Sequence, residues 1–325
     1  MSTPSNKGRG RWLFPLLLTL ILLALPAGYF FFLHTPAPVL PPPVAAPVPP
    51  PEPEPEAPKL VEVSLAEVEG TVELRQPDGT WRPAQKGDLL RAQDAVRTSA
   101  GSMALLVGGE AWEVRLESGT EVAVDELTSS ISRLMLESGM ATAKVKGKER
   151  HSFEVRAAGS DAVAKTEDAE FAISNNGAGT VAVGARSGEV ELTGAGKVVI
   201  VRAGQQSVVR PGHGPSEPTS VPSSLLLKVK WPSQRVHRTR RLVVSVETLP
   251  GAHVEVAGEV VRADEEGRFR HTLKAKEGKN RVQVRASSVG GVRTADEAEL
   301  QVDTRAPRIG IDDDLWGVKK NKGKR

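Results

Sequence analysis

The chain has 325 residues with 43 Lys or Arg and 40 Asp or Glu, so its formal net charge at pH 7 is only +3. This near balance lacks the basic signature of nucleic-acid-binding domains, and we expect no nucleic-acid partner. The chain has no cysteine, which excludes disulfides, thiolate catalysis, cysteine-bound metal and a lipid-modified cysteine anchor.

Residues 12–33 form an apolar run that contains no charged residue, WLFPLLLTLILLALPAGYFFFL. A helix of this length, at about 1.5 Å per residue, would be roughly 33 Å long and would cross a hydrocarbon core of about 30 Å. The run therefore predicts a single transmembrane anchor. A cleaved signal peptide ending at Ala27 is the alternative, but the apolar run continues past Ala27 and exceeds the usual length of a signal-peptide core.

Charge around this run predicts its orientation. The preceding stub, residues 1–11, carries Lys7, Arg9 and Arg11 and no acidic residue, whereas the first charge after the run is Glu52. Because positively charged flanks stay in the cytoplasm, we expect a cytoplasmic N-terminus and an external location for the rest of the chain.

Residues 34–59 are rich in proline, which removes backbone donors and favours the extended polyproline II conformation. The 24 residues from 35 to 58, at about 3.1 Å each, could hold the next domain as much as roughly 75 Å from the membrane. The segment is predicted to be a spacer, either a simple flexible one or one that crosses the peptidoglycan layer.

From residue 61 onward the apolar residues recur with a period of two, which is typical of β-strands. The phase of the alternation changes near Ala66, and this change predicts a β-bulge. Glycine-containing turn signals separate the strands at intervals of about 8–12 residues. They occur at 78–79, 108–109, 118–119, 138–139, 176–177 and 194–196. We therefore predict an all-β fold.

The β pattern divides into two regions. Residues 60–210 are predicted to be the first β domain, and residues 211–225, rich in Pro, Gly and Ser, the linker that follows it. Residues 226–310 show seven further short alternating segments, which predict a small β-sandwich. Residues 311–325 end in a basic stretch without apolar residues and are predicted to be a disordered tail.

Between about residues 61 and 209 the chain contains a series of short segments in a fixed order. They are GTV at 70–72, GTW at 79–81, GDLL at 87–90, VRTS at 96–99, GSMALL at 101–106, SGT at 118–120, LESG at 136–139, FEV at 153–155, FAI at 171–173, VAV at 181–183, GEV at 188–190 and AGQ at 203–205. Through these segments the region resembles the FecR domain family of bacterial envelope proteins. The resemblance implies an antiparallel β domain in the cell envelope. It also implies kinship with regulators that relay an outer-membrane signal to a cytoplasmic sigma factor. The stub of residues 1–11 is too short to fold and could meet such a factor only as a linear peptide.

Residues 226–310 resemble the immunoglobulin-like modules that are appended to many bacterial surface proteins. The segments LPGA at 249–252, EGRF at 266–269, EGKN at 277–280 and VDTRAP at 302–307 carry this resemblance. They are turn signals between alternating strands, and they imply a fold rather than a function.

Candidate chemistry is sparse in the sequence. The six histidines are scattered without metal-binding spacing, and no nucleophile-elbow or phosphate-loop motif is present, so we expect no cofactor, no metal and no enzymatic activity. Four acidic residues are the only candidates for a glycan-active site, which would need paired carboxylates: Glu110, Glu113, Asp125 and Glu170. A basic cluster and one tryptophan near the C-terminus are candidate partner contacts: Arg235, Arg238, Arg240, Arg241 and Trp316.

These features lead to three hypotheses. The first is a non-enzymatic binding or scaffold protein, anchored in the bacterial inner membrane with most of the chain in the periplasm. Its partner would be an envelope protein or an anionic cell-wall polymer. The second is an envelope signalling regulator related to FecR-type sigma-factor regulators, and the third is a glycan-active envelope enzyme.

Overall fold

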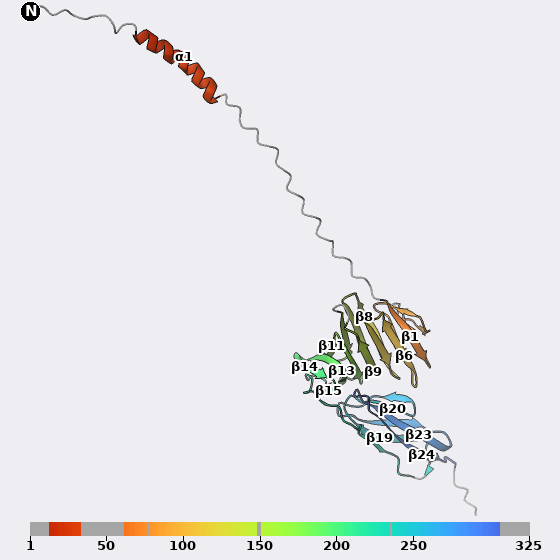
Figure 1. Cartoon of the computed structure of the whole chain (residues 1–325). Helices are drawn as coiled ribbons and strands as arrows, with labels where there is room; N and C mark the ends of the chain where they lie inside the picture. Colours follow the sequence, from red (N-terminus) through yellow and green to blue (C-terminus); the bar gives the residue numbers. More distant parts are fainter. Residues whose placement is uncertain (1–12, 34–61, 77, 148–150, 235, 306–325) are drawn as a thin grey trace, which may run out of the picture. The chain divides into compact units, whose positions relative to one another are not determined.

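A computed structural model of the chain describes residues 13–33, 62–76, 78–147, 151–234 and 236–305 (Figure 1). The chain divides into two compact units, Met1–Glu56 and Ala57–Arg325. The second unit contains all the β-strands of the described residues.

In the first unit, the helix α1 spans Leu13–Leu33 with Pro26 inside it. Its described leucine and aromatic side chains are exposed, from Leu16 to Phe31. Within the part of the chain that the structure describes, no helix meets the length and apolarity needed to cross a membrane. The anchor at 12–33 thus remains a prediction. Lys7, Arg9 and Arg11, the stub 1–11 and the linker 34–59 lie outside the described residues.

The second unit begins with a sixteen-stranded sheet assembly that encloses one hydrophobic core between residues 63 and 209. Trp112, Phe153 and Phe171 are its largest fully buried side chains, and the ring of Phe153 lies against the rings of the other two. The strands are β1 Val63–Glu69, β2 Val72–Arg75, β3 Trp81–Pro83, β4 Leu89–Leu90, β5 Ala95–Thr98, β6 Met103–Gly108, β7 Trp112–Leu116, β8 Glu121–Leu127, β9 Ile131–Val145, β10 Ser152–Ala157, β11 Val163–Thr166, β12 Ala169–Asn175, β13 Val181–Gly194, β14 Lys197–Arg202, β15 Gln205–Val209 and β16 Thr219–Ser220.

Two long strands run through both layers of this assembly. The first half of β9 pairs with β8 and β10, and its second half pairs with β7 and β12. Likewise, β13 pairs first with β12 and β15 and then with β11 and β14. Gly139 and Gly188, with φ of 99° and 70°, lie where the pairing changes. The turn predicted at 138–139 is therefore wrong, because the glycine redirects a continuous strand from one layer to the other.

The sheet register confirms one prediction and corrects another. The pairing of β1 with β6 shifts between Leu65 and Glu67, which confirms the bulge predicted near Ala66. The first domain is not purely antiparallel, however, because β10 pairs with β9 in parallel. Parallel neighbours need a crossover connection, and here the second half of β9 and the loop after it form that connection.

The remaining strands form a second sandwich with a core of its own. They are β17 Leu227–Lys230, β18 Val236–His237, β19 Arg241–Thr248, β20 His253–Val256, β21 Glu259–Val261, β22 Arg268–Lys274, β23 Gly278–Ser287 and β24 Arg293–Val302. One sheet has the order β17-β19-β22, and the facing sheet has the order β18-β24-β23-β20-β21. The described residues thus contain eight strands here, where the alternation predicted seven. All-β architecture is confirmed for the described residues between 62 and 305.

The immunoglobulin-like assignment and the boundaries 60–210, 211–225 and 226–310 stay predictions. The predicted tail 311–325 lies outside the described residues. In the predicted linker, β16 pairs with β15, and the Val221 amide donates to the carbonyl oxygen of Gly204. Part of this segment therefore lies along the first sheet assembly.

Candidate binding surface

A buried serine and histidine in the first core have the spacing of a nucleophile and its base. Ser132 Oγ lies 2.9 Å from His151 Nε2, and His151 Nδ1 lies 3.1 Å from the carbonyl oxygen of Ser129. A carbonyl only accepts, so Nδ1 donates to it, and Nε2 lies within hydrogen-bond distance of the serine hydroxyl. Trp112 Nε1 donates to the same hydroxyl oxygen at 2.9 Å. Since Ser132 is 0% exposed, no substrate reaches it, and the three side chains form a polar link inside the core.

The four acidic candidates do not converge on one site. Glu113 and Glu170 line a common hollow of about 590 Å³, to which both sandwiches contribute residues. The register places Lys144 between them, opposite both carboxylates. Each also has its own cation, Lys146 Nζ at 3.6 Å from Glu113 and Arg186 Nη1 at 2.6 Å from Glu170.

The other two acidic candidates lie elsewhere along the chain. Asp125 is exposed within β8, and Glu110 lies in the turn between β6 and β7. In the described part of the chain, no three His, Cys, Asp or Glu residues are close enough together to hold a metal ion.

The two sandwiches contact each other through a patch of small residues on the first one. Val289, in the turn between β23 and β24, packs with Met140, Ala172 and Ala182 and is only 7% exposed. Gly184 also belongs to this patch. A Cβ at this position would lie only 2.8 Å from the carbonyl oxygen of Val289, so a side chain there would clash with the turn. The small residues Ala172, Ala182 and Gly184 leave room for the valine to dock.

Hydrogen bonds and one ion pair surround this apolar contact. Ser174 Oγ donates to the carbonyl oxygen of Gly251, and Asn176 Nδ2 donates to that of Ala263 at 2.9 Å. Arg293 Nη2 lies 3.2 Å from Glu117 Oε1. The contact between the two sandwiches is therefore both packed and polar, as expected of a fixed junction.

His253, at the start of β20, is buried beside this junction. Burial lowers the pKa of its imidazole, and this effect outweighs the attraction of Glu255 and Glu117. Glu255 Oε1 is 3.9 Å from Nε2, which has no hydrogen-bond partner among the described residues. The residue is thus a neutral histidine near neutral pH.

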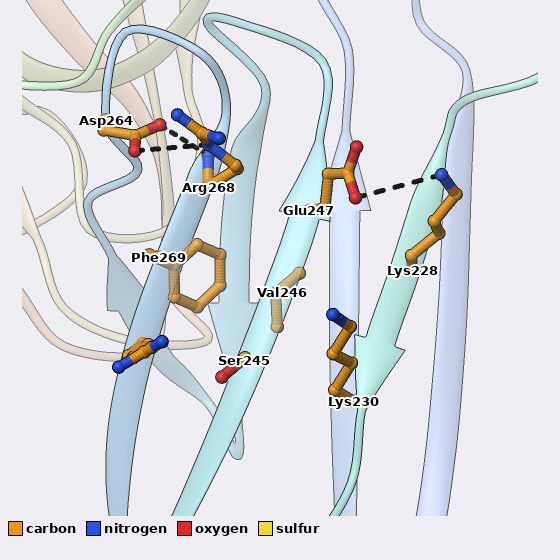
Figure 2. Close-up of a pocket in the computed structure, with 9 residues that line it drawn as sticks. Lys228, Lys230, Ser245, Val246, Glu247, Asp264, Arg268 and Phe269 are labelled. Atoms are coloured by element: carbon orange, nitrogen blue, oxygen red, sulfur yellow. Dashed lines mark hydrogen bonds and ion pairs between the residues drawn. The ribbon is translucent and has the colours of Figure 1, made fainter.

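A hollow of about 610 Å³ lies on the outer face of the sheet β17-β19-β22. Figure 2 shows the side chains around it, which come from all three strands and from the loop before β22. We call this face the basic face and define it by its outward-pointing cations: Lys228, Lys230, Arg241, Arg268, Arg270 and Lys274.

The strand register arranges the basic face in rows. In the first row Glu247 lies opposite both Lys228 and Arg268, and the Lys228 Nζ–Glu247 Oε2 distance is 3.8 Å. Arg268 also pairs with Asp264 Oδ2 at 3.7 Å (Figure 2). The charges of this row are therefore largely balanced within the protein.

The second row is not balanced. Ser245 lies opposite Lys230 on one side and opposite Arg270 on the other. In the described parts of the chain neither cation has an ion-pair partner. Neighbouring strands are about 4.8 Å apart, so both long side chains can reach a group placed over the Ser245 hydroxyl. Two cations and a hydroxyl donor that converge in this way suit an anionic group.

Only part of the basic cluster predicted from sequence belongs to this face. Arg241 lies on β19 opposite Lys274 and is the outermost member of the face. Arg238 donates to the carbonyl oxygen of Arg305, and Arg240 pairs with Glu277 at 3.6 Å. Arg235 and Trp316 lie outside the described residues.

Sequence reasoning missed Lys230, Ser245 and Arg270. Their only sequence signal is the alternation of cations with apolar residues in LKVK at 227–230 and RFR at 268–270. That alternation predicts an outward face for each strand, but it does not predict that the strands are neighbours.

Comparisons with known proteins address the first sheet assembly. The model of the FecR protein family matches residues 94–191. No curated protein matches the chain. Two crystal structures of a candidate anti-sigma factor from Parabacteroides distasonis ATCC 8503, at 1.65 and 2.50 Å resolution, are each 23% identical over 39% of this chain, with a TM-score of 0.34. Each match spans 59% of the other chain.

The fibronectin(III)-like modules of CbhA from Clostridium thermocellum are 16% identical over 56% of this chain and 94% of theirs, with a TM-score of 0.20. At such low TM-scores these structural likenesses carry no argument. The family match, in contrast, falls inside the span where the sequence motifs occur, and it runs from the start of β5 into β13. Residues 94–191 of this chain are a FecR domain.

Proposed function

We propose that this chain is a membrane-anchored signalling regulator of the FecR type, whose β unit receives its signal outside the cytoplasm. The observation that carries the proposal is the FecR domain at residues 94–191. In this proposal the FecR domain binds a partner in the cell envelope. The stub 1–11 binds a cytoplasmic factor as a short linear peptide and so transmits the signal.

Two features support a receiving role for the β unit. The FecR domain is joined to the second sandwich by the seated Val289 and by the Arg293–Glu117 pair. A partner that binds either sandwich therefore acts on a single body. The apolar run at 12–33 with its basic stub supplies the proposed route across the membrane.

Deletion of residues 2–8 tests this proposal in cells. The deletion keeps Arg9, Arg11 and the apolar run, so the chain should still insert while losing most of its cytoplasmic peptide. We expect loss of a transcriptional response that the full-length chain supports. Deletion of residues 319–325, also seven residues, is the matched control and should leave the response intact. An unchanged response after the first deletion would contradict signalling through the stub.

The anchor and its orientation need a separate test. Protease added to spheroplasts should digest the β unit of the full-length chain, and cell lysis should add nothing to this digestion. Alkaline extraction should leave the chain in the membrane fraction. Recovery of the chain in the soluble fraction, or protection of the β unit until lysis, would contradict the proposed topology.

A non-enzymatic scaffold in the envelope is the second candidate function. The unpaired cations of the basic face favour it, because they provide a contact surface that signalling through the stub does not require. A scaffold would tolerate deletion of residues 2–8 without loss of function. Incubation with cell-wall material should release no fragments for either candidate, whereas release of fragments would indicate a glycan-active enzyme.

A further inference from the structure

The basic face has a repeating order along the strands. The unbalanced row Lys230–Ser245–Arg270 is followed by an uncharged row, Val243 opposite Thr272, and then by a second cationic row, Arg241 opposite Lys274. The two cationic rows are four positions apart on β19, which corresponds to about 14 Å along an extended strand. The face therefore alternates between positions for anions and a neutral strip.

The neutral strip is exposed to solvent. Val243 is 52% exposed, although apolar side chains on a sheet usually face the core. Thr272, opposite it, is also exposed and adds a methyl group and a hydroxyl. The valine side chain can contact the apolar C–H face of a sugar ring. The threonine hydroxyl can form a hydrogen bond with one of the hydroxyl groups of the sugar.

We propose that the basic face binds an extended acidic polysaccharide, whose anionic groups are spaced along the chain and separated by neutral sugars. The acidic groups would lie over Ser245 and between Arg241 and Lys274, and a neutral ring would lie on Val243. This inference goes beyond the proposed function and does not depend on it, because binding can be measured whether or not the chain signals.

The geometry favours this occupant over other anionic partners. A polymer with a charge on every unit would place anions against the uncharged strip and against Glu247 of the first row. An anionic bilayer would gain little, because Val243 is a single exposed aliphatic side chain among the cations of this face. A peptide with consecutive acidic residues, which a cluster of arginines could otherwise recognise, would place carboxylates against the uncharged strip.

The double variant Lys230→Gln/Arg270→Gln tests the proposal in the full-length chain, purified in a non-ionic detergent. The probe is hyaluronan, in which a charged sugar alternates with a neutral one, and neutral dextran is the uncharged counterpart. We expect the variant to bind hyaluronan about tenfold more weakly or worse, because it loses two charge-assisted contacts. Wild-type binding should weaken between 50 and 200 mM salt, and dextran should not bind measurably.

A matched control is the double variant Lys86→Gln/Arg91→Gln. Both residues are exposed near β4 in the first sheet assembly, and neither has an ion-pair partner in the part of the chain that the structure describes. The control removes one Lys and one Arg, as the test variant does, and should change affinity by less than about twofold if the binding is local. Equal losses in both variants would overturn the proposal in favour of a general charge effect.

A third variant, Ser245→Glu, places a carboxylate between the two cations. It should keep the fold, because cross-strand pairs of opposite charge stabilise a sheet, and it should block hyaluronan binding. Circular dichroism and the melting temperature check that each variant is folded. Wild-type protein that fails to bind hyaluronan overturns the proposal. Variants that still bind hyaluronan but no longer bind phosphatidylglycerol vesicles or poly-glutamate overturn it as well.

Discussion

Single side chains decide what the interior of this protein can do. Ser132 and His151 have the spacing of a catalytic pair, but burial makes them a structural link that satisfies the Trp112 indole N–H. His253 differs, because its Nε2 lacks a hydrogen-bond partner among the described residues while burial holds the ring neutral. Its neutrality in the folded state links the stability of the protein to pH.

We predict that His253 makes the protein less stable in mild acid. Its folded-state pKa is lowered, so the unfolded chain binds a proton that the folded chain does not. The contribution of His253 is complete above the unfolded pKa of about 6.5 and is lost as the pH falls toward the folded pKa, at up to about 1.4 kcal/mol per pH unit. Denaturant unfolding at pH 7.5 and 5.5 measures this slope.

The comparison that isolates His253 is His253→Gln against His213→Gln. The first variant should show a smaller loss of unfolding free energy between the two pH values than the wild type. His213 is exposed, and its replacement should leave the wild-type slope unchanged. Equal slopes in the wild type and in His253→Gln would show that this histidine does not govern the acid sensitivity.

At the scale of elements, the long strands β9 and β13 hold the first sheet assembly together because each belongs to both layers. Gly139 lets β9 change layers with φ of 99°, and a Cβ there would come within 2.5 Å of the Thr120 Cα atom. Thr120 Oγ1 also bonds both the amide and the carbonyl of Met140, at 3.0 Å each. The passage of β9 from one layer to the other therefore requires a glycine, without a side chain, at position 139.

We predict that Gly139→Ala destabilises the protein by about 3 kcal/mol, from backbone strain and a steric clash together. Gly79→Ala is the control, because Gly79 has φ of 86° but no atom within 4 Å of the added Cβ. This control should lower the free energy of unfolding by about 1 kcal/mol, from backbone strain alone. Equilibrium unfolding in urea gives both values, and equal costs would mean that the clash at Thr120 relaxes freely.

Across the whole molecule, the contact between the two sandwiches depends on Val289 and the small residues that receive it. Apolar packing at such a junction is sensitive to a buried charge. The same contact brings together residues that are more than 100 positions apart, such as Arg293 and Glu117. The β unit should therefore unfold as one cooperative body.

We predict that Val289→Asp uncouples the two sandwiches. Calorimetry of the full-length chain should show one transition for the β unit of the wild type and two for the variant, since a buried unpaired carboxylate opposes the docking. Val198→Asp, at an exposed position on β14, should keep the single transition. Two transitions already present in the wild type would contradict the fixed junction.

Local pattern in the sequence accounts for much of this fold. Period-two alternation identified the strands, the phase change identified the bulge at Leu65, and the motifs between 61 and 209 identified the FecR domain. These features are local, because a residue and its near neighbours determine which face of a strand is apolar. The turn predicted at 138–139 was wrong because the prediction also used only local pattern. A glycine that ends a strand and a glycine that redirects one look alike in sequence.

The sequence by itself determined an all-β chain with a FecR domain and an apolar N-terminal run. Only the tertiary structure decided which strands are neighbours. Lys230, Ser245 and Arg270 form a row because β17, β19 and β22 pair in that order, and Val289 meets Ala172 and Ala182 because two sandwiches dock. Such contacts join residues far apart in the chain, and they follow from long-range strand register and packing that no local pattern encodes.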